Sequence, residues 1–381
     1  MKKENYKKVE CKICGAAVHI IEAHLKEAKH EVVKIEDYMA KYPDAPIVSE
    51  AAKTRLLEIQ GAVMADKVDF DIRKTFGISL SADVKTIKGF ANPKKTTPEI
   101  DADYVFDRKI LTIIAFALSG EKENVLLTGA TGSGKSSVIE QVVARLNLPY
   151  YRINFDGDIT RSDIIGQWTL KGEAMEFQYG ILPRAMMEGA VLCLDEWDCI
   201  NPAIGMILQP VLEGKSLIIT ETGDIIKPHE DFRIFATSNT IGQGDQTGLY
   251  NGTQPQNFAQ LDRFTLVGIV DYPTEKVEKK ILAKKAGIVD EDLVKKILTV
   301  ATLIRKSFIK GETVATMSTR TIVNIGQKLV AFGDVKAAYA FTFLNKLNAE
   351  DKVFASEIIQ RVFGGVVTAE TTMEELEDSE Q

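Results

Sequence analysis

The stretch Gly129-Ala-Thr-Gly132-Ser-Gly134-Lys135-Ser136 matches the pattern G-x-x-x-x-G-K-[ST] of a phosphate-binding loop. The residues before it, 124–128, form an apolar run that predicts a buried strand. Those after it, 136–146, carry apolar side chains at helical spacing. Glycines let backbone N–H groups turn toward a phosphate, and the N-terminus of a helix adds positive potential. This order of strand, glycine-rich turn and helix predicts a nucleotide-binding loop.

The loop and the first turn of its helix supply the predicted ligands of ATP and Mg²⁺. Lys135 can reach the β- and γ-phosphates, and the Ser136 hydroxyl can bind Mg²⁺. The predicted nucleotide-binding residues are Gly129, Ala130, Thr131, Gly132, Ser133, Gly134, Lys135, Ser136, Ser137 and Asp195.

A second apolar run, Ala190-Val-Leu-Cys-Leu194, ends in the carboxylates of Asp195 and Glu196. In a phosphate-loop protein, the first acid at such a strand end helps hold Mg²⁺, and the second can orient and polarise the attacking water. The alternative is a buried strand followed by two solvated acids. We predict that Asp195 and Ser136 are the Mg²⁺ ligands and that Glu196 is catalytic.

Three further residues complete the predicted catalytic set. Asn239 ends the strand pattern 232–237 and could hold the water from the other side, although a plain strand-end asparagine is the alternative. Arg263 could project toward a neighbouring subunit's γ-phosphate, or form a structural salt bridge. Arg320 opens a helix of the C-terminal region and could reach the nucleotide of its own chain. With Lys135 and Glu196, these residues make up the predicted catalytic group.

Composition and order of elements indicate the fold class. The 381 residues carry a net charge of −7, which argues against a general nucleic-acid-coating role. Five candidate strands alternate with helices, at 124–128, 150–155, 190–194, 232–237 and 265–270. Such alternation predicts an α/β core with a parallel sheet flanked by helices. There is no run of 18 apolar residues and no signal-peptide pattern, and four cysteines make no disulfide framework, so we expect no membrane partner and a cytoplasmic location.

The chain is predicted to have five parts. They are a zinc-finger-like unit at 1–42, a linker and helix at 43–100, the ATPase core at 101–274, an α-helical lid domain at 275–366, and an acidic, disordered tail at 367–381. The residues 71–80, and those that follow to 98, have the pattern of irregular connectors, and an apolar helix is expected at 107–118. Predicted lid helices cover 275–285, 291–307, 319–331, 334–347 and 351–363. Hairpins are expected at 168–178 and 216–227, where they could touch a substrate in a ring's pore.

The N-terminal unit has its own metal-binding pattern. Cys11, Cys14, His24 and His30 offer two thiolates and two imidazoles at a spacing that suits tetrahedral Zn²⁺, with both histidines on a helix. The alternative is a helical tip with incidental cysteines and histidines. The segments Cys11-Lys-Ile-Cys-Gly15, His24-Leu25 and Tyr38-Met-Ala-Lys-Tyr42-Pro43 resemble the Ros/MucR-type zinc fingers, a family that binds DNA. Residues 1–41 carry a net charge of only about +2, so a finger that docks a protein is at least as well supported.

From about residue 70 to 364 the chain resembles the CobS-type AAA+ ATPases of the MoxR group, the motor subunits of aerobic cobaltochelatase. The resemblance is carried by DIRKTFG at 71–77, YVFDR at 104–108, RINFDG at 152–157 with TRSDIIG at 160–166, NTIG at 239–242, GLYNGTQ at 248–254, AQLDR at 259–263, FLNK at 343–346 and QRVFG at 360–364. It implies ATP hydrolysis, a hexameric ring and a CobT-like partner with a metal-ion-dependent adhesion domain. The finger departs from this pattern and favours a relative that acts on another target.

Three hypotheses follow from these patterns. The first is a ring-forming ATPase that remodels a partner or drives a metal-chelatase-like complex. The second is a DNA-directed ATPase recruited through the finger. The third is a nucleotide-dependent scaffold that does not hydrolyse ATP, and the position of Glu196 argues against it because a scaffold needs no water-activating carboxylate.

Overall fold

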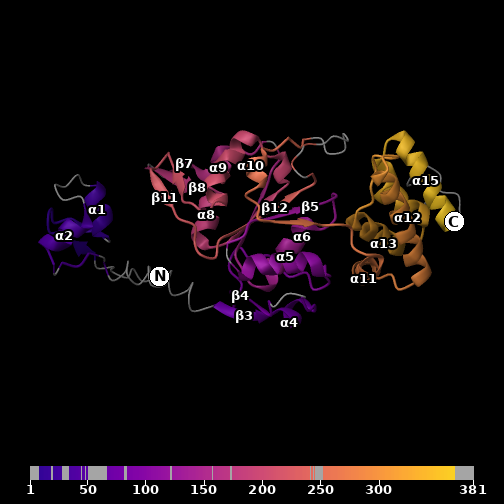
Figure 1. Cartoon of the computed structure of the whole chain (residues 1–381), viewed down its shortest axis with the longest axis horizontal. Coiled ribbons are helices and arrows are strands. Elements are labelled where there is room, and N and C mark those ends of the chain that lie inside the picture. Colours follow the sequence, from indigo (N-terminus) through magenta and orange to yellow (C-terminus); the bar gives the residue numbers. More distant parts are fainter. Residues whose placement is uncertain are drawn as a thin grey trace. The chain divides into compact units, whose positions relative to one another are not determined.

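The computed structural model describes residues 8–18, 20–27, 34–43, 45–47, 49, 67–80, 84–120, 122–156, 158–171, 174–240, 242, 244 and 252–364 (Figure 1). The chain divides into two compact units, Met1–Val68 and Asp69–Gln381, which are described separately. His30, most of residues 43–66 in the predicted linker and helix, and the predicted tail at 367–381 lie outside the described residues.

The N-terminal unit has a two-stranded ribbon followed by helices. Its elements are β1 (Val9–Glu10), β2 (Ala17–Val18), α1 (Ile21–Glu27) and α2 (Ile35–Lys41), and the two strands pair in antiparallel fashion. The core of the unit consists of buried side chains from the ribbon and both helices, namely Val9, Cys11, Ile21, Leu25 and Tyr38. This arrangement places the Cys11–Cys14 turn beside helix α1.

The second unit is built around a parallel five-stranded sheet, and each of the five predicted strands is present. The strands are β5 (Val125–Thr128), β6 (Tyr150–Asn154), β9 (Val191–Asp195), β12 (Arg233–Ser238) and β13 (Leu266–Ile269). Their order across the sheet is β13-β5-β12-β9-β6, with every pairing parallel. All carboxyl ends therefore meet at one edge, as the predicted α/β class requires.

Helices cover both faces of this sheet, because its strands are apolar on both sides. Leu126, Leu192 and Ile234 pack on one face against α8 (Ile181–Glu188) and α9 (Pro202–Leu212). Val125, Cys193 and Phe235 pack on the other against α5 (Arg108–Ser119) and α6 (Lys135–Arg145). Successive strand residues point to opposite faces, so neighbouring positions belong to two different cores. The shorter elements near this core are α7 (Arg161–Ile165), the 3-10 turn η1 (Trp197–Cys199) and α10 (Phe258–Leu261).

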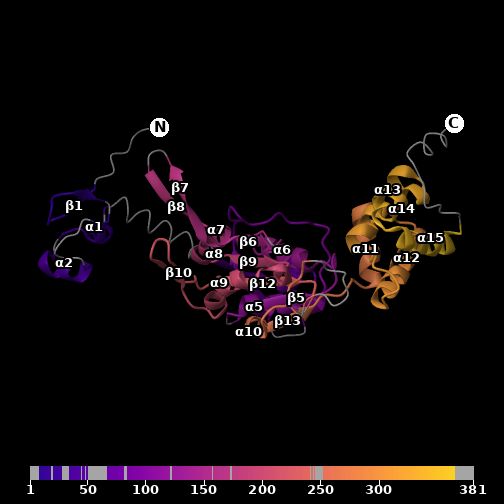
Figure 2. The ribbon, with the colours of Figure 1, turned by 90° about the horizontal axis from the view of Figure 1, so that it is seen from above.

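Two antiparallel hairpins extend from this core, at the predicted places. One pairs β7 (Gly166–Lys171) with β8 (Ala174–Tyr179), and the other pairs β10 (Leu217–Ile219) with β11 (Asp224–Ile226). Figure 2 shows the first hairpin projecting away from the sheet. Both hairpins expose large apolar side chains, among them Leu170 and Ile225.

The interpretation of residues 71–98 as irregular connectors is wrong. The region contains β3 (Lys67–Asp71), α4 (Ile72–Phe76) and β4 (Thr86–Phe90), and β3 pairs with β4. The Asp71 carboxylate caps α4 by accepting a 2.8 Å hydrogen bond from the Lys74 N–H, and Gly77 ends the helix at φ 70°. Ile72, Phe76 and Phe90 pack into the same core as α5 and α6. Each of these three elements has five residues, which is too few for a helical or strand period to be recognised in the sequence.

The remaining helices form one bundle, the lid, coloured orange to yellow in Figure 1. They are α11 (Glu275–Ala286), α12 (Glu291–Ile309), α13 (Thr319–Phe332), α14 (Val335–Thr342) and α15 (Ala349–Phe363), with the 3-10 turn η2 (Leu344–Lys346). The helix expected at 334–347 is shorter than predicted because the backbone leaves helical geometry at Phe343, where φ is −133°.

Gly89 provides a test of the short ribbon's place in the core. A Cβ added at Gly89 would lie 2.2 Å from the Leu146 carbonyl oxygen, and the Phe90 N–H donates to that oxygen at 2.9 Å. We expect Gly89→Ala to push strand β4 off the core and lower the free energy of unfolding by about 1–3 kcal/mol, measured by urea denaturation. Gly120→Ala is the control, because its nearest atom is 3.4 Å away. Equal stability of the two variants would contradict this packing.

Candidate functional site

The phosphate loop runs from the end of β5 into α6, as predicted. Two of its glycines lie where a side chain has no room. A Cβ on Gly129 (φ 151°) would lie 2.2 Å from the Val270 carbonyl oxygen, and one on Gly132 (φ 68°) would lie 2.4 Å from the Ser318 Cβ. The left-handed φ and these close approaches both require glycine. The loop is therefore held between the sheet edge and the start of the lid.

Lys135 lies inside this loop. Its ammonium donates to the carbonyl oxygens of Gly129 (2.7 Å) and Ala130 (3.0 Å) and to the Asn239 side-chain oxygen (2.9 Å). Burial lowers the pKa of Lys135 to about 8, while nearby carboxylates, Asp198 foremost, favour its charged form. The structure thus brings together Lys135 and Asn239, which lie on different elements and are far apart in sequence.

Asp195, at the carboxyl end of β9, collects donors from three neighbouring elements. Ser136 on α6 donates to Oδ1 at 2.6 Å, Thr237 on β12 donates to the same oxygen, and Arg152 on β6 pairs with Oδ2 through Nε at 2.9 Å. Burial alone would raise the pKa of this carboxyl, but the hydrogen bonds and the Arg152 charge outweigh it and leave the pKa lowered. Asp195 is therefore an anion beside a hydroxyl, the oxygen donor set that Mg²⁺ prefers.

Glu196 follows with a left-handed backbone, φ 53°. Its N–H donates to the Thr237 hydroxyl at 3.2 Å. Burial, together with the charges of Asp195 and Asp198, raises the pKa of Glu196. A carboxylate with a raised pKa accepts a proton more readily, which suits a general base.

Asp198 is fully buried beneath the Asn239 turn. Its Oδ2 accepts from the N–H groups of Asn239 (3.0 Å) and Thr240 (2.8 Å) and from the Thr240 hydroxyl (2.9 Å). These bonds fix the backbone at Asn239, so its side chain faces Lys135.

One cavity of about 480 Å³ joins most of the predicted residues. It is lined by loop residues 131–132 and 134–137, and by Arg152, Asn154, Asp195, Glu196, Thr237, Ser238, Asn239 and Arg320. Arg320 reaches it from α13 of the lid. Arg320 also lines an adjacent cavity, together with Ser133 and the lid residues Ile281 and Val323.

Arg263 lies elsewhere. Its guanidinium pairs with Glu213 at 2.9 and 2.5 Å, the salt bridge that was the alternative interpretation. The Asn124 side chain donates to the Arg263 carbonyl at 2.9 Å, which places Arg263 at the start of β5, while the phosphate loop follows the end of that strand. The strand from Asn124 to the start of the phosphate loop is about 15 Å long, because an extended chain rises ~3.3 Å per residue. The structure does not bring Arg263 to its own chain's loop.

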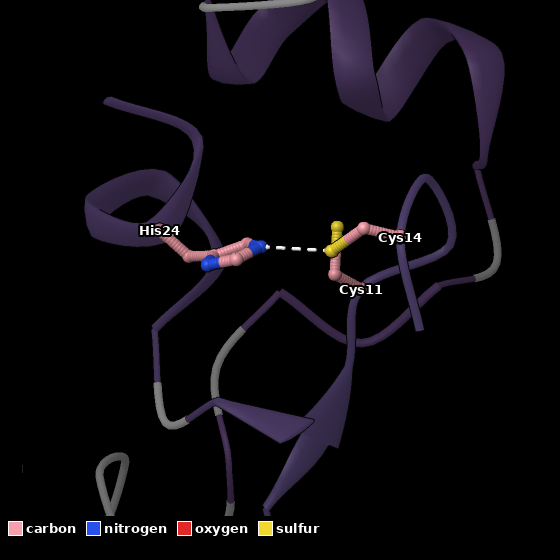
Figure 3. A group of neighbouring side chains, drawn as sticks. All are labelled: Cys11, Cys14 and His24. Carbon is pink, nitrogen blue, oxygen red and sulfur yellow. Dashed lines mark hydrogen bonds between the residues drawn. The ribbon is translucent and has the colours of Figure 1, made fainter. Parts of the chain in front are cut away.

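In the N-terminal unit, three of the four predicted metal ligands converge. Cys11, Cys14 and His24 present ligand atoms that all lie within 4.8 Å of one another, and the Cys14 sulfur lies 3.1 Å from Nε2 of His24 (Figure 3). Donors about 2.3 Å (sulfur) and 2.0 Å (nitrogen) from one tetrahedral ion would be separated by roughly 3.5 Å, so the three residues fit such an ion.

Arg152, Thr237 and Asp198 contact the predicted site residues but were not themselves predicted from the sequence. Arg152 is the third of the five residues of β6, and Thr237 is the last residue but one of β12. A polar side chain near the carboxyl end of a parallel strand was the available signal, because those ends meet at the ligand-binding edge.

Comparison with known proteins agrees with this geometry. Residues 124–254 match the model of the AAA domain of the dynein-related subfamily, and residues 278–362 match that of the CbbQ/NirQ/NorQ C-terminal domain. The chain is 36% identical to the aerobic cobaltochelatase subunit CobS of Sinorhizobium sp over 320 residues, 79% of this chain and 95% of CobS. The chain belongs to the CobS/CbbQ/NorQ group of AAA+ ATPases.

Other relatives in this group match a smaller share of the chain. Protein CbbQ of Hydrogenophilus thermoluteolus is 30% identical over 53% of this chain and 72% of its own length. Protein NorQ of Paracoccus denitrificans is 28% identical over 59% of this chain and 80% of its own length. This AAA+ ATPase is an ATP hydrolase, and its α/β fold with a parallel sheet is that of the group.

Among the described residues, none of the helices is both long and apolar enough to span a membrane.

Thr237 provides a test of the acidic pair. Its hydroxyl donates to Asp195 and accepts from the Glu196 N–H, so Thr237→Val removes both bonds without changing shape. We expect kcat for ATP hydrolysis to fall about tenfold, because one unsatisfied buried polar group costs roughly 1–3 kcal/mol.

The control for Thr237→Val is Ser238→Ala at the next position. Within the described structure the Ser238 hydroxyl is buried without a hydrogen-bond partner, so its removal should change kcat by less than about threefold. Equal rates for Thr237→Val and Ser238→Ala would contradict the importance of the Thr237 bonds.

Proposed function

We propose that this ATPase hydrolyses ATP at the subunit interfaces of a homo-oligomeric ring, a hexamer, and uses the energy to remodel a partner protein. The supporting observation is the separation of the predicted catalytic residues across the sheet. Lys135, Asp195 and Asn239 gather at its carboxyl edge, whereas Arg263 lies at the amino edge. A second copy could supply the arginine that the first copy's site lacks.

We assign the residues as follows. Ser136 and Asp195 bind Mg²⁺, which supplies charge neutralisation on the phosphate oxygens when bound, and Lys135 with the loop amides binds the phosphates. Glu196 orients and deprotonates the attacking water, with Asn239 on the water's other side. Arg320 senses the nucleotide from the lid of its own chain, and Arg263 acts on the neighbour's γ-phosphate. We further propose that the chain is divided into the finger, linker, core, lid and tail whose bounds are given above.

The two hairpins are the proposed contacts with the partner. Trp168, Leu170 and Met175 on β7–β8 are exposed, as are Ile218 and Ile225 on β10–β11. Exposed apolar side chains on a projecting hairpin suit a protein-binding surface. By relation to CobS, we propose a CobT-like partner with a metal-ion-dependent adhesion domain and, as one specific version, a cobaltochelatase-like complex.

Mixing two inactive variants tests the ring. Lys135→Ala lacks the phosphate-binding lysine, and Arg263→Ala lacks the arginine proposed to act in trans. In an equal mixture some interfaces combine an intact Lys135 with an intact Arg263, so we expect part of the ATPase activity to return. We also expect the rate per subunit of the wild type to rise with protein concentration.

The control mixture is Lys135→Ala with Glu196→Gln. Both of these changes affect the same site of one chain, so mixing should restore nothing. A concentration-independent rate of the wild type without rescue in the first mixture would refute the shared site.

For the N-terminal unit we propose Zn²⁺ bound by Cys11, Cys14 and His24, with His30 as the predicted fourth ligand. The convergence of the first three supports this assignment. The unit would recruit the ATPase to its target, which is DNA in the second hypothesis and a protein in the first. A gel-shift titration with and without Zn²⁺, repeated across salt concentrations, separates these targets because phosphate contacts weaken steeply with salt.

Zinc analysis tests the metal site directly. The purified chain should contain about one Zn²⁺, and Cys14→Ser should lose it because a hydroxyl is a poor ligand for this ion. Cys199→Ser serves as the matched control, since Cys199 lies in the other unit of the chain. Zinc retained equally by both variants would exclude Cys14 as a ligand.

A further inference from the structure

The segment that joins the core to the lid, residues 270–274 between β13 and α11, contacts the phosphate loop and the strand residue that precedes it. The Val270 N–H donates to the Thr128 carbonyl at 2.7 Å, where the loop begins. The Tyr272 hydroxyl donates to the Thr131 carbonyl, inside the loop, at 3.1 Å. Any movement of this joint therefore changes contacts of the loop itself.

Tyr272 also contacts the lid. Its oxygen lies 3.2 Å from the Thr316 hydroxyl, which precedes α13. A carbonyl only accepts, so the single phenol proton goes to Thr131 and the Thr316 hydroxyl donates to the phenol oxygen. Burial raises the pKa of Tyr272, which keeps this proton in place. One hydroxyl thus bridges the phosphate loop and the lid.

The ring of Tyr272 packs on a buried ion pair. The guanidinium carbon of Arg305 lies 3.9 Å from the ring centroid. Arg305 donates to both carboxylate oxygens of Glu278, at 3.0 and 2.8 Å, and through Nε to the Met317 carbonyl at 2.7 Å. Separating the members of a buried pair leaves uncompensated charges, so the energetics favour keeping this group together.

This group holds the start of α13. The Thr319 hydroxyl donates to Glu278 at 2.9 Å, and Arg320 is the next residue. Ser318, which caps α13 by accepting from the Thr321 N–H, lies against Gly132 of the loop. The contacts therefore form a continuous path from the loop through Tyr272, Arg305 and Glu278 to the residue before Arg320.

The planarity of the peptide gives the contact with Thr131 a direct consequence. The Thr131 carbonyl and the Gly132 N–H belong to one trans peptide and point in opposite directions. By holding the carbonyl, Tyr272 sets the direction of the Gly132 N–H, one of the amides of the phosphate-binding loop. Occupation of the loop and the position of the lid then act on the same hydroxyl.

We propose that Tyr272 is a positioning residue that couples phosphate binding in the loop to the placement of α13 and its Arg320. The inference rests on the role proposed above for Arg320 as the lid's contact with the nucleotide. A ligand shifts a conformational equilibrium only through contacts that differ between the two states. In this proposal the Tyr272 bridge is such a contact: it joins the loop and the lid at one atom in the described conformation and is broken when the lid moves away.

Hydrogen exchange of the full chain with and without Mg²⁺ and a non-hydrolysable ATP analogue tests the coupling. In wild type, saturating analogue should slow amide exchange in the phosphate loop and at residues 318–323. In Tyr272→Phe, which keeps the ring on Arg305, the loop should still be protected, but the protection at 318–323 should be lost. We expect its kcat/KM to fall about 2- to 10-fold, the usual effect of one lost hydrogen bond.

Tyr339→Phe is the matched control. Tyr339 is a fully buried tyrosine of α14 whose hydroxyl has no partner within the described structure, so the same atom is removed without breaking a bond. Its exchange pattern and kcat/KM should stay within twofold of wild type. A second variant, Thr316→Val, leaves the Thr131 bond intact and should lose the protection at 318–323 as Tyr272→Phe does.

The proposal is overturned if the analogue does not protect residues 318–323 in wild type, or if that protection survives in Tyr272→Phe. It is also overturned if Thr316→Val keeps the protection at residues 318–323. This outcome decides the matter even if Tyr272→Phe loses that protection only because it binds the nucleotide weakly. The ATPase rate of Arg320→Ala separately tests the proposed function. An unchanged rate would refute the role proposed for Arg320. A loss of protection at residues 318–323 in Tyr272→Phe would still show that Tyr272 couples the loop to α13.

Discussion

The carboxylate of Asp195 is the charge on which the site depends. It is almost fully buried, and an isolated carboxylate in such a position would take up a proton. Ser136, Thr237 and Arg152 keep it ionised, and they come from a helix and two strands that flank its own. Only the strand order β5-β12-β9-β6 brings these elements together at one edge. The ionisation state of Asp195 therefore depends on the topology of the sheet.

The same parallel sheet gives the subunit two chemically different ends. Each strand points from the Arg263 edge to the phosphate-loop edge, and β5 touches both through Asn124 and the loop that follows Thr128. In the proposed ring, the groups at opposite ends of the subunit would meet at each head-to-tail interface. Arg263 is held by Glu213 within the chain, so assembly would exchange this ion pair for a phosphate contact.

The lid is joined to the core by polar contacts as well as by the chain. Lys285 of α11 pairs with Asp101 at 2.5 Å, and Tyr272, within the joint itself, donates to the phosphate loop. The ion pair of Arg305 and Glu278 lies inside the lid and supports the start of α13. A surface pair such as Lys285–Asp101 contributes little stability, whereas the buried pair of Arg305 and Glu278 has one fixed geometry. The Tyr272 contacts, which pack on the buried pair, therefore do more to set the position of the lid than the surface salt bridge does.

The sequence by itself determined the motifs and the elements that carry them. The phosphate loop, the acids at 195–196 and Asn239 were recognisable because each follows a strand whose apolar run is visible locally, and the two hairpins showed alternation around a turn. The β3–β4 ribbon was missed because two short strands with one turn of helix give no period, although the Asp71 cap and Gly77 were visible signals. Tertiary structure alone decided that Arg152 and Thr237 meet Asp195, that Tyr272 touches Thr131, and that Arg263 lies away from its own loop. These contacts join residues far apart in the chain, and their partners depend on strand order and helix placement, which local patterns do not encode.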